Sequence, residues 1–277
     1  MTRKQEKIRL WRDSSLPDGL ELLRASCFDY RYPAHFHEEF VVAAFARGAQ
    51  RHRIAGREGV ASAGTILIIP PGEVQTGEAA ERDRGWDYCA FYPTRRFLES
   101  IADDLLGRGG YLDFGNDPIL DDADVTRHLL RAHAVIASAP DRMEKECAAY
   151  DGFGAIIARY GQQSRHGRLA RVGRADMRRA IDYLQEHFAE TVSVSEVATV
   201  AGLSEYHFMR VFRASTGLSV HSYLTQIRLN RAKSLLSCGV SSVEAAVSVG
   251  FFDQSHLIRH FRQHYGATPR EFAAACC

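Results

Sequence analysis

The sequence lacks the features of membrane-spanning and secreted proteins. No run of apolar residues approaches the roughly 18 that a membrane-spanning helix needs, and the charged start, MTRKQEKIRLWRD, has no apolar signal-peptide core. None of the six cysteines forms a CxxC pair. Reduced thiols are therefore expected. The terminal pair Cys276-Cys277 could be redox-active, but a frayed tail is the preferred interpretation. We expect a cytoplasmic protein that has no membrane partner.

The chain also has almost no net charge, but its charge is unevenly distributed. The 35 Lys and Arg against 34 Asp and Glu leave a formal net charge of +1. From residue 165 onward, 14 basic residues stand against 9 acidic ones, a net charge of +5, and the remainder carries −4. A basic C-terminal third in a near-neutral chain indicates that this third meets a polyanion.

The hydrophobic pattern divides the chain into two domains, for which 277 residues are enough. Residues 20–93 contain short apolar runs bounded by Gly or Pro, such as EFVVAAFA and TILIIP, which predict the strands of a small β-barrel. After Pro93, apolar residues recur three and four apart, which predicts helices. We expect an α+β protein with a barrel and flanking helices at 1–163, a polar linker at 164–173 and an all-α domain at 174–277.

The all-α domain contains an internal duplication. Ala198 and Gly202 match Ala246 and Gly250 at an offset of 48 residues. One residue is then inserted, and the match continues at an offset of 49. It pairs Ser204, Arg210, Phe212, Arg213, Gly217 and Tyr223 with Asp253, Arg259, Phe261, Arg262, Gly266 and Phe272. Agreement over this length indicates two equivalent structural units.

Each copy has the pattern of a helix-turn-helix. A short helix ends at a glycine that can adopt the left-handed conformation, and Ser204 or Asp253 then stands at the N-cap of a second helix. We expect this second helix to bury Phe208, Val211 and Phe212 in the first copy, and Leu257 and Phe261 in the second. Its opposite face then carries Tyr206, Met209, Arg210 and Arg213, or Gln254, Ser255, Ile258, Arg259 and Arg262.

Matched arginines on the two copies favour DNA reading over an ordinary solvated face. Arginine can hydrogen-bond O6 and N7 of guanine together, worth about 1–3 kcal/mol of discrimination, and Gln254 could read adenine in the same way. The run between the copies, SVHSYLTQIRLNRAKSLLSC, predicts a helix of roughly 18 residues, about 27 Å long. Such a rod can hold two recognition helices near one DNA turn apart, about 34 Å, so one chain could read two successive major-groove segments.

Residues 174–273 resemble the DNA-binding domain of the AraC/XylS family of bacterial transcription regulators. The motifs AGLSEYHFMRVFRASTGLSVHSYL, IRLNRAKSLL and VGFFDQSHLIRHFRQHYGATPREF carry the resemblance. It implies double-stranded promoter DNA as a partner and RNA polymerase as a further one. It places base contacts at Tyr206, Met209, Arg210, Gln254, Ser255, His256 and Arg259, to which the exposed faces add Arg213 and Arg262. Met209 departs from the polar residue that is common there, and a thymine methyl contact would suit it.

The helices between residues 121 and 161 carry apolar stripes that have two interpretations. The stripes consist of Val125, Leu129 and Leu130 on one helix and Ala149, Phe153 and Ile156 on the next. They can pack on the chain's own barrel, or they can pair two chains into the homodimer that the family resemblance implies. One helix could do both.

The resemblance also implies that the barrel is cupin-like and binds a small effector. In HFHEEF, the residues His35, His37 and Glu39 would alternate along a strand and point into the barrel. The stretch GTILIIPPGEVQTG resembles the second cupin motif, but Gln75 stands where metal-binding cupins place a histidine, and a neutral amide is a poor ligand for iron, nickel or zinc. We therefore expect no metal and no cofactor. The residues interpreted as lining a pocket for a small polar, amino-acid-like effector are His35, His37, Glu39 and Gln75, to which strand alternation adds Trp86, Tyr88 and Arg53.

Other functions stay open at this point. The chain could be a metal-dependent cupin enzyme with an appended DNA-binding domain, or a constitutive DNA-binding dimer whose barrel senses nothing. The histidine-rich stretch could also be a hydrogen-bonded structural cluster. The preferred interpretation is a non-enzymatic, sequence-specific regulator in which the effector favours one arrangement of the domains or of the dimer.

Overall fold

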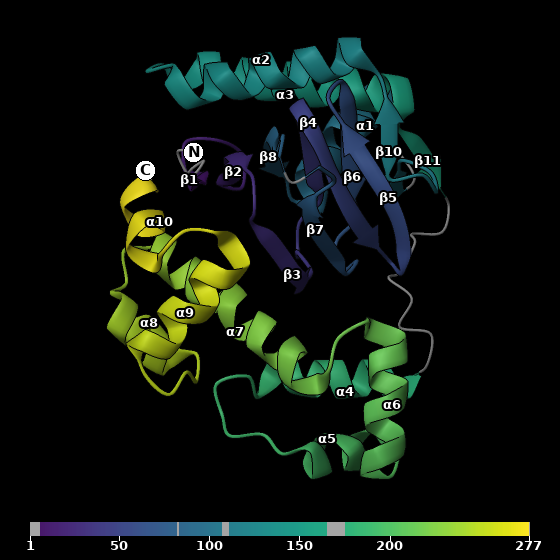
Figure 1. The fold of residues 1–277 in the computed structure, drawn as a ribbon, viewed down its shortest axis with the longest axis vertical. Coiled ribbons are helices and arrows are strands. Elements are labelled where there is room, and N and C mark those ends of the chain that lie inside the picture. Colours follow the sequence, from purple (N-terminus) through teal and green to yellow (C-terminus); the bar gives the residue numbers. More distant parts are fainter. Residues whose placement is uncertain (1–5, 82, 107–110, 165–174, 277) are drawn as a thin grey trace. The chain divides into compact units, whose positions relative to one another are not determined.

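The computed structural model describes residues 6–81, 83–106, 111–164 and 175–276. By internal contacts the chain divides into two compact units, the first made mostly of residues up to 168 and the second mostly of residues from 169. The first unit runs from purple to teal in Figure 1, and the second from teal-green to yellow. The expected linker at 164–173 lies outside the described residues, apart from Ser164 at the end of a short strand.

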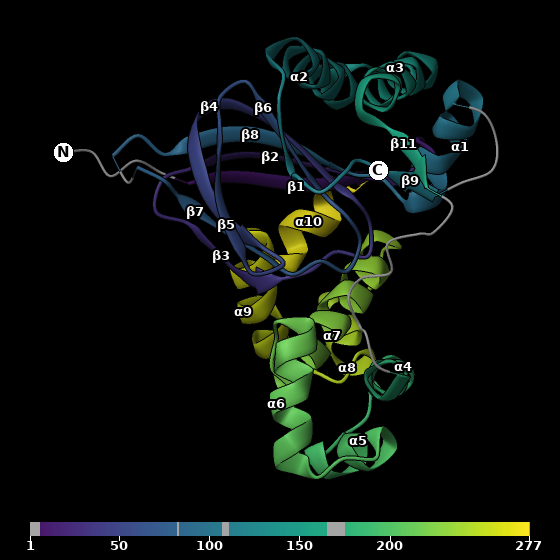
Figure 2. The ribbon, with the colours of Figure 1, turned by 90° about the vertical axis from the view of Figure 1, so that its right-hand side faces the viewer.

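The first unit is built on antiparallel strands that curve into a barrel (Figure 2). The strands are β1 (Lys7–Asp13), β2 (Leu20–Cys27), β3 (Arg31–His35), β4 (Val41–Ile54), β5 (Arg57–Ser62), β6 (Thr65–Ile69), β7 (Gln75–Ala79), β8 (Trp86–Tyr92), β9 (Tyr111–Asp113), β10 (Ile119–Asp121) and β11 (Gln162–Ser164). The main path is β1-β2-β8-β4-β6-β10, while β5 and β7 pair with β4 and β3 pairs with β7. Strands β9 and β11 form a separate pair.

Strand β4 carries the barrel from one half of the sheet to the other. Its first half pairs with β6 and β8, and its second half pairs with β5 and β7. The register with β8 shifts between Phe45 and Arg47, a bulge of the kind that bends a strand. Gly48 follows the bulge with a φ of 69°, and a Cβ there would overlap the carbonyl oxygen of Gly85. Only glycine meets both demands at this corner.

The central strands of the sheet are buried on both faces. One face contributes Leu22, Val42, Ala44, Cys89 and Phe91 to the core shared with the helices. The alternating residues Leu23, Ala25, Ala43, Phe45 and Tyr88 are buried as well. Because side chains alternate between the faces of a strand, this second set points into the barrel.

Three helices cover the outer face of the sheet: α1 (Arg95–Leu106), α2 (Ala123–Ser138) and α3 (Arg142–Tyr160). Helices α2 and α3 lie side by side (Figures 1 and 2). The apolar stripes of α2 and α3 belong to the core of the barrel: Val125, Leu129, Ala149, Phe153 and Ile156 are buried, and Leu130 packs against them. The expectation that these stripes pack on their own barrel is therefore confirmed, and pairing of two chains through them stays a prediction.

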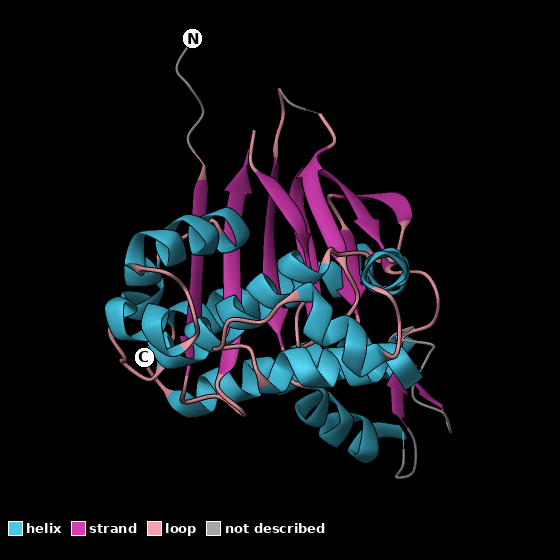
Figure 3. Ribbon diagram, turned by 90° about the horizontal axis from the view of Figure 1, so that it is seen from below, coloured by secondary structure: helices cyan, strands magenta, loops and turns pink. Residues whose placement is uncertain are grey.

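In its described residues from 175 onward, the second unit is all helical, as expected. Figure 3 shows the helices of both units in cyan and the strands in magenta. Its helices are α4 (Ala175–Glu186), α5 (Val194–Ala201), α6 (Glu205–Thr216), α7 (Val220–Ser237), α8 (Ser242–Ser248), α9 (Gln254–Tyr265) and α10 (Pro269–Ala275). The expected 18-residue rod between the two copies is α7. Within the described ranges, no helix is long and apolar enough to cross a membrane.

The strand prediction for residues 20–93 was too narrow. Strand β1 precedes it, and β9, β10 and β11 lie beyond it, between and after the flanking helices. β1 has exposed Lys7 and Arg9 on the same face as buried Trp11 and Asp13. A mixed face of this kind weakens the alternation of polar and apolar residues from which strands are recognised.

Candidate DNA interface and effector site

The first helix-turn-helix consists of α5, a turn at Gly202 and α6. Ser193 and Glu196 form a capping box at the start of α5. Gly202 ends the helix in the left-handed conformation, with a φ of 70°, and donates its N–H to the carbonyl groups of Ala198 and Thr199. The predicted glycine stop is therefore confirmed. Ser204 occupies the N-cap of α6, as predicted, although its side chain makes no capping hydrogen bond.

Helix α6 buries one face and exposes the other. Phe208 and Phe212 are fully buried and Val211 is partly buried. The opposite face exposes Tyr206, Met209, Arg210 and Arg213, with 76% of Tyr206 and 44% of Met209 accessible. This is the face predicted to meet DNA, and it forms because residues three and four apart share a side of a helix.

The second helix-turn-helix repeats this arrangement with α8 and α9. Asp253 caps α9 by accepting a hydrogen bond from the backbone N–H of His256 at 2.7 Å, as predicted. Leu257 and Phe261 are fully buried, Ile258 is partly buried, and Tyr265 extends the buried row. The residues exposed on the opposite face are Gln254, Ser255, Arg259 and Arg262.

Two predicted base contacts of α9 are engaged within the protein. The Gln254 side-chain N–H donates to the Ser242 hydroxyl at 2.7 Å, so α8 holds this amide. The ring of His256 is partly buried and packs edge-on against Phe251, with 5.2 Å between the ring centroids. Both side chains would have to rearrange before they could read a base bidentately or insert deeply into a groove.

Behind His256, a histidine row continues on α9. The ring centroids of His256 and His260 are 4.7 Å apart, and those of His260 and His264 are 6.3 Å apart. Burial, together with the neighbouring His256, His264 and Arg259, lowers the pKa of His260 to about 4. The row therefore adds no charge at His260 near neutral pH, and the cations of α9 that face solvent are its arginines.

The rod α7 is fastened to both copies. Arg228 donates to the carbonyl oxygens of Phe188 and Glu190, at 2.7 Å and 2.8 Å, and so holds the segment that precedes α5. Asn230, half a turn further along, accepts hydrogen bonds from Gln226 on the same helix and from the hydroxyl of Tyr265 on α9. On the first recognition helix, Phe212 packs edge-on against Tyr223 of the rod, with 5.4 Å between the ring centroids, so both recognition helices contact α7.

In the barrel, the predicted alternation of HFHEEF was wrong. Strand β3 ends at His35, and residues 36–40 form a bend with no strand structure. His35 is buried, and its Nδ1 lies 2.7 Å from the carbonyl oxygen of Pro33. His37 is buried and packs against Tyr92, and Glu39 is partly exposed. The consecutive acids Glu38 and Glu39 are poor strand residues, which accounts for the early end.

The described residues contain no group of three or more His, Cys, Asp or Glu side chains arranged to hold a metal ion. His35, His37 and Glu39 are thus not assembled as a facial triad.

The second half of β4 places two polar side chains, Gln50 and His52, inside the barrel. Together with Ile54 they are buried, and they alternate with the exposed Arg51 and Arg53. Because the arginines face out, the alternating set faces in. Arg53 pairs with Glu58 at 2.6 Å on the outside, so its assignment to the pocket was wrong. Gln50 and His52 were not predicted from the sequence, because the stretch QRHRI resembles a solvent-exposed charged segment. The signal that could have found them is the alternation of Gln50, His52 and Ile54 with the two arginines.

The neighbours of His52 on the two adjacent strands are both glycines. It lies directly opposite Gly59 on β5 and Gly77 on β7. A Cβ at Gly59 would come within 2.7 Å of His52 Nε2, so the ring lies over that glycine. His52 Nδ1 is buried without a hydrogen-bond partner among the described residues, and burial lowers the pKa of His52.

Three predicted pocket residues are buried with this set. Trp86 is fully buried, and its Nε1–H has no partner among the residues that the structure describes. Tyr88 stacks on Phe45, with centroids 5.4 Å apart. Gln75 is buried opposite Ile54 in the β4–β7 register. An unpaired buried donor costs about 1–3 kcal/mol, so a polar ligand in the barrel would find unsatisfied groups at Trp86 and His52.

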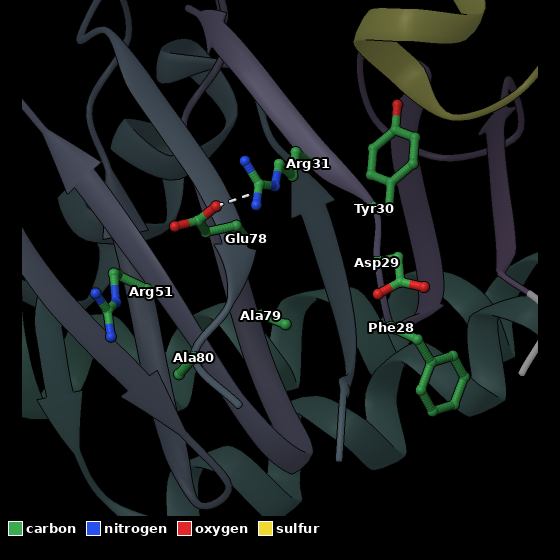
Figure 4. Close-up of a pocket in the computed structure, with 8 residues that line it drawn as sticks. All are labelled: Phe28, Asp29, Tyr30, Arg31, Arg51, Glu78, Ala79 and Ala80. Carbon is green, nitrogen blue, oxygen red and sulfur yellow. Dashed lines mark ion pairs between the residues drawn. The ribbon is translucent and has the colours of Figure 1, made fainter. Parts of the chain in front are cut away.

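Figure 4 shows a polar depression outside the barrel. Arg31 pairs with Glu78 across it at 3.3 Å, and Arg51 stands beside them without a salt bridge among the described residues. Residues 28–30 form its rim, and Glu6 fixes them by accepting hydrogen bonds from three consecutive backbone N–H groups. The depression holds about 380 Å³, and none of the predicted effector residues lines it.

Two family descriptions match the chain in the order of its two units. Residues 19–153 match the AraC-like ligand binding domain, and residues 197–275 match a helix-turn-helix domain. The chain belongs to the AraC/XylS family of transcriptional regulators. It is a DNA-binding regulator that carries a ligand-binding domain.

Individual proteins support this assignment over most of the chain. An uncharacterized HTH-type transcriptional regulator of Bacillus subtilis, YbfI, is 26% identical over 238 residues, covering 86% of each chain. The arabinose operon regulatory protein of Escherichia coli is 28% identical over 233 residues, covering 80% of this chain and 75% of that one. In fold, the chain is similar to ToxT of Vibrio cholerae, with a TM-score of 0.58 at 11% identity, over 99% of this chain and 98% of that chain.

Proposed function

We propose that each chain reads two successive major-groove segments of promoter DNA, with α6 in one and α9 in the next. The observation that carries this proposal is the exposure of Arg210 and Arg259 at matched positions of the duplicated helices. Both recognition helices bury their aromatic faces and are fastened to α7, which supports a fixed spacing. Phosphate contacts would supply most of the affinity, and the two arginines the base preference.

Retention of genomic fragments tests this proposal. The full chain and the double variant Arg210→Ala/Arg259→Ala are each mixed with sheared genomic DNA, and the retained fragments are sequenced. The wild-type protein should retain a small set with a shared two-part motif, and the double variant should lose that set. Arg178→Ala, which removes an exposed cation on α4, is the matched control and should keep it. Retention of the same set by the double variant would contradict the proposal.

We further propose that a small polar effector, amino-acid-like in its hydrogen-bonding groups, binds inside the barrel. Support comes from the unpartnered Trp86 Nε1 and His52 Nδ1 and from the enclosed amides of Gln50 and Gln75. A constitutive DNA-binding dimer would have no use for these unsatisfied buried groups. A ligand that binds the folded protein must raise its stability. A thermal-shift screen with polar metabolites should therefore give a hit, and that hit should change the affinity for the retained DNA.

The variant Gly59→Ala tests whether the effector binds beside His52. The added methyl group would displace the His52 ring, because the two would lie within 2.7 Å. The thermal shift given by the effector should be lost, while binding to DNA fragments in its absence is kept. Gly154→Ala on α3 is a suitable control, because its φ is not positive and a Cβ there would only reach ordinary contact with Leu105, at 3.9 Å. An effector that stabilises the Gly59→Ala variant as well as the wild type would place its site elsewhere.

The remaining features of the proposal are a cytoplasmic homodimer that works with RNA polymerase and catalyses no reaction. Leu105, Met143 and Tyr150 are exposed on α1 and α3, and they offer apolar surface for pairing. Light scattering of the purified protein should give twice the chain mass. Metal analysis of the same sample addresses the cupin enzyme: stoichiometric iron, zinc or nickel would favour the enzyme over the regulator.

A further inference from the structure

A cavity of about 660 Å³ lies on the outer face of the sheet, beside α2. Its floor is formed by β1, β2 and β8, and its wall by Leu130, His133 and Ala134 of α2. Arg24 and Cys89 of the floor alternate with Ala25 and Tyr88, whose side chains point into the barrel. Ala25 and Tyr88 also line the cavity, so it lies on the opposite face of the same strands from the proposed effector site and borders that site at Tyr88. Its volume is in the range of small-molecule sites.

The strand register places cations side by side on this floor. Arg9 of β1 lies directly opposite Arg24 of β2, and Lys7 lies opposite Ser26 one row away. Like charges directly opposite each other on neighbouring strands are destabilising. No salt bridge to Lys7, Arg9 or Arg24 is formed within the described part of the chain, and Arg9 instead lies over the Trp11 ring, 4.9 Å from its centroid.

The cavity's own acid offsets this charge only in part, although the charge of Arg24 contributes to lowering its pKa. Asp87 is the carboxylate among the lining residues, and it is engaged by Arg47 through contacts of 2.7 Å and 3.1 Å. The hydrogen bond from Arg47 lowers the pKa of Asp87. Burial raises the pKa of the Cys89 thiol to about 12, so that group stays neutral. Three cations against one carboxylate already in an ion pair leave the floor net positive.

The wall supplies an apolar surface with one polar atom. His133 is buried between the rings of Trp11 and Phe91, with centroids 5.3 Å and 5.2 Å away. Burial lowers its pKa to about 4, although a hydrogen bond to the Leu23 backbone opposes this. The imidazole is thus neutral near pH 7, and its Nε2 has no partner among the described residues. Leu130 and Ala134 complete the wall.

We propose that this cavity is a second ligand site that binds a small organic anion. Its carboxylate lies between Arg9 and Arg24, which relieves the repulsion of the facing guanidinium groups. Its short apolar body lies along Leu130, Ala134 and the edge of His133. Such a ligand joins the β1–β2 edge of the sheet to α2.

Calorimetry and thermal shift on the full chain test the site, with three probes: hexanoate, inorganic phosphate and hexylammonium. Hexanoate should bind saturably and raise the unfolding temperature. Phosphate, which lacks the apolar body, should bind more weakly, and the cation hexylammonium should not bind. Arg24→Gln should raise the hexanoate Kd about tenfold, the loss expected for a hydrogen bond between charged groups, and should not lower the unfolding temperature without ligand.

The controls separate this site from others. Arg57→Gln removes an exposed cation on β5, away from the cavity, and should leave the hexanoate Kd unchanged. Trp86→Phe alters the barrel interior and should also leave it unchanged. The proposal is overturned if hexanoate does not bind, if hexylammonium or phosphate binds as well, or if Arg24→Gln binds hexanoate like the wild type. Loss of binding in Trp86→Phe alone would likewise overturn it. None of these outcomes depends on the DNA-binding proposal.

Discussion

The hydroxyl of Tyr265 on α9 donates a hydrogen bond to the side-chain oxygen of Asn230 on α7, at 2.9 Å. The same oxygen accepts a second hydrogen bond from Gln226, one turn earlier on the rod. Tyr265 is buried, and the ammonium group of Lys233 lies 5.2 Å from the centroid of its ring. Through this contact the second recognition helix is fixed to the rod that also holds the first.

Tyr265→Phe removes this hydrogen bond and keeps the ring. We expect the free energy of unfolding to fall by about 1 kcal/mol, the usual worth of one such bond. Denaturant titration measures the change. Tyr150→Phe is the control, because no hydrogen bond of the Tyr150 hydroxyl is formed within the described residues. If the rod fixes the spacing, Tyr265→Phe should also weaken binding to a two-segment site more than binding to either segment alone. Equal losses would show that the contact is only structural.

Gly202 and Gly250 occupy equivalent positions in the two helix-turn-helix copies, after α5 and after α8, and can be compared directly. Gly202 and Gly250 both have positive φ angles, 70° and 83°. A Cβ at Gly202 meets nothing within 4 Å, whereas a Cβ at Gly250 would lie 2.6 Å from the backbone oxygen of Ala189. Gly202→Ala should cost about 1–2 kcal/mol, from the left-handed conformation alone. Gly250→Ala should cost more, because backbone must move. Thermal unfolding of the two variants compares them, and equal losses would contradict this explanation.

The carboxylate of Asp122 makes the stability of the barrel unit depend on pH. It caps α2 by accepting hydrogen bonds from the N–H groups of Asp124 and Val125, and its second oxygen contacts Tyr160 and Arg159 at 2.7 Å and 2.9 Å. Burial raises its pKa, but these partners outweigh burial and the pKa is lowered below 3.8. A lowered folded-state pKa gives stability that is fully present above the unfolded-state pKa and lost as pH falls through the folded-state value.

Asp122→Asn should therefore lower stability near neutral pH and flatten its dependence on pH below about 4. Unfolding titrations at several pH values measure both effects. Asp124→Asn changes an exposed carboxylate in the same turn and is the control. If the stability of Asp122→Asn fell with decreasing pH as steeply as that of the wild type, the role given to this carboxylate would be contradicted.

The helical unit could be predicted from sequence in detail, and the barrel only in outline. Helical period, glycine stops and duplication are local signals, and they located α5 to α9 with the buried Phe208 and Phe261. The missing capping hydrogen bond of Ser204 and the hydrogen bond that engages Gln254 depend on side-chain rotamers, which no local pattern specifies.

In the barrel, the inward face of β4 depends on a bulge at Phe45 and Arg47, and the end of β3 depends on a bend after His35. A shift of one residue reverses which side chains face inward. That is why Arg53 was assigned to the pocket, while Gln50 and His52 were missed.

The most direct test compares the base preferences of Arg210→Ala and Arg259→Ala. Binding of each variant to a library of sites, randomised one base pair at a time, gives its preference at every position. Each variant should lose about 1–3 kcal/mol at the wild-type site and relax mainly one position, and the two relaxed positions should lie about 10 base pairs apart. Uniform weakening on every sequence by both variants would contradict base reading by the paired helices.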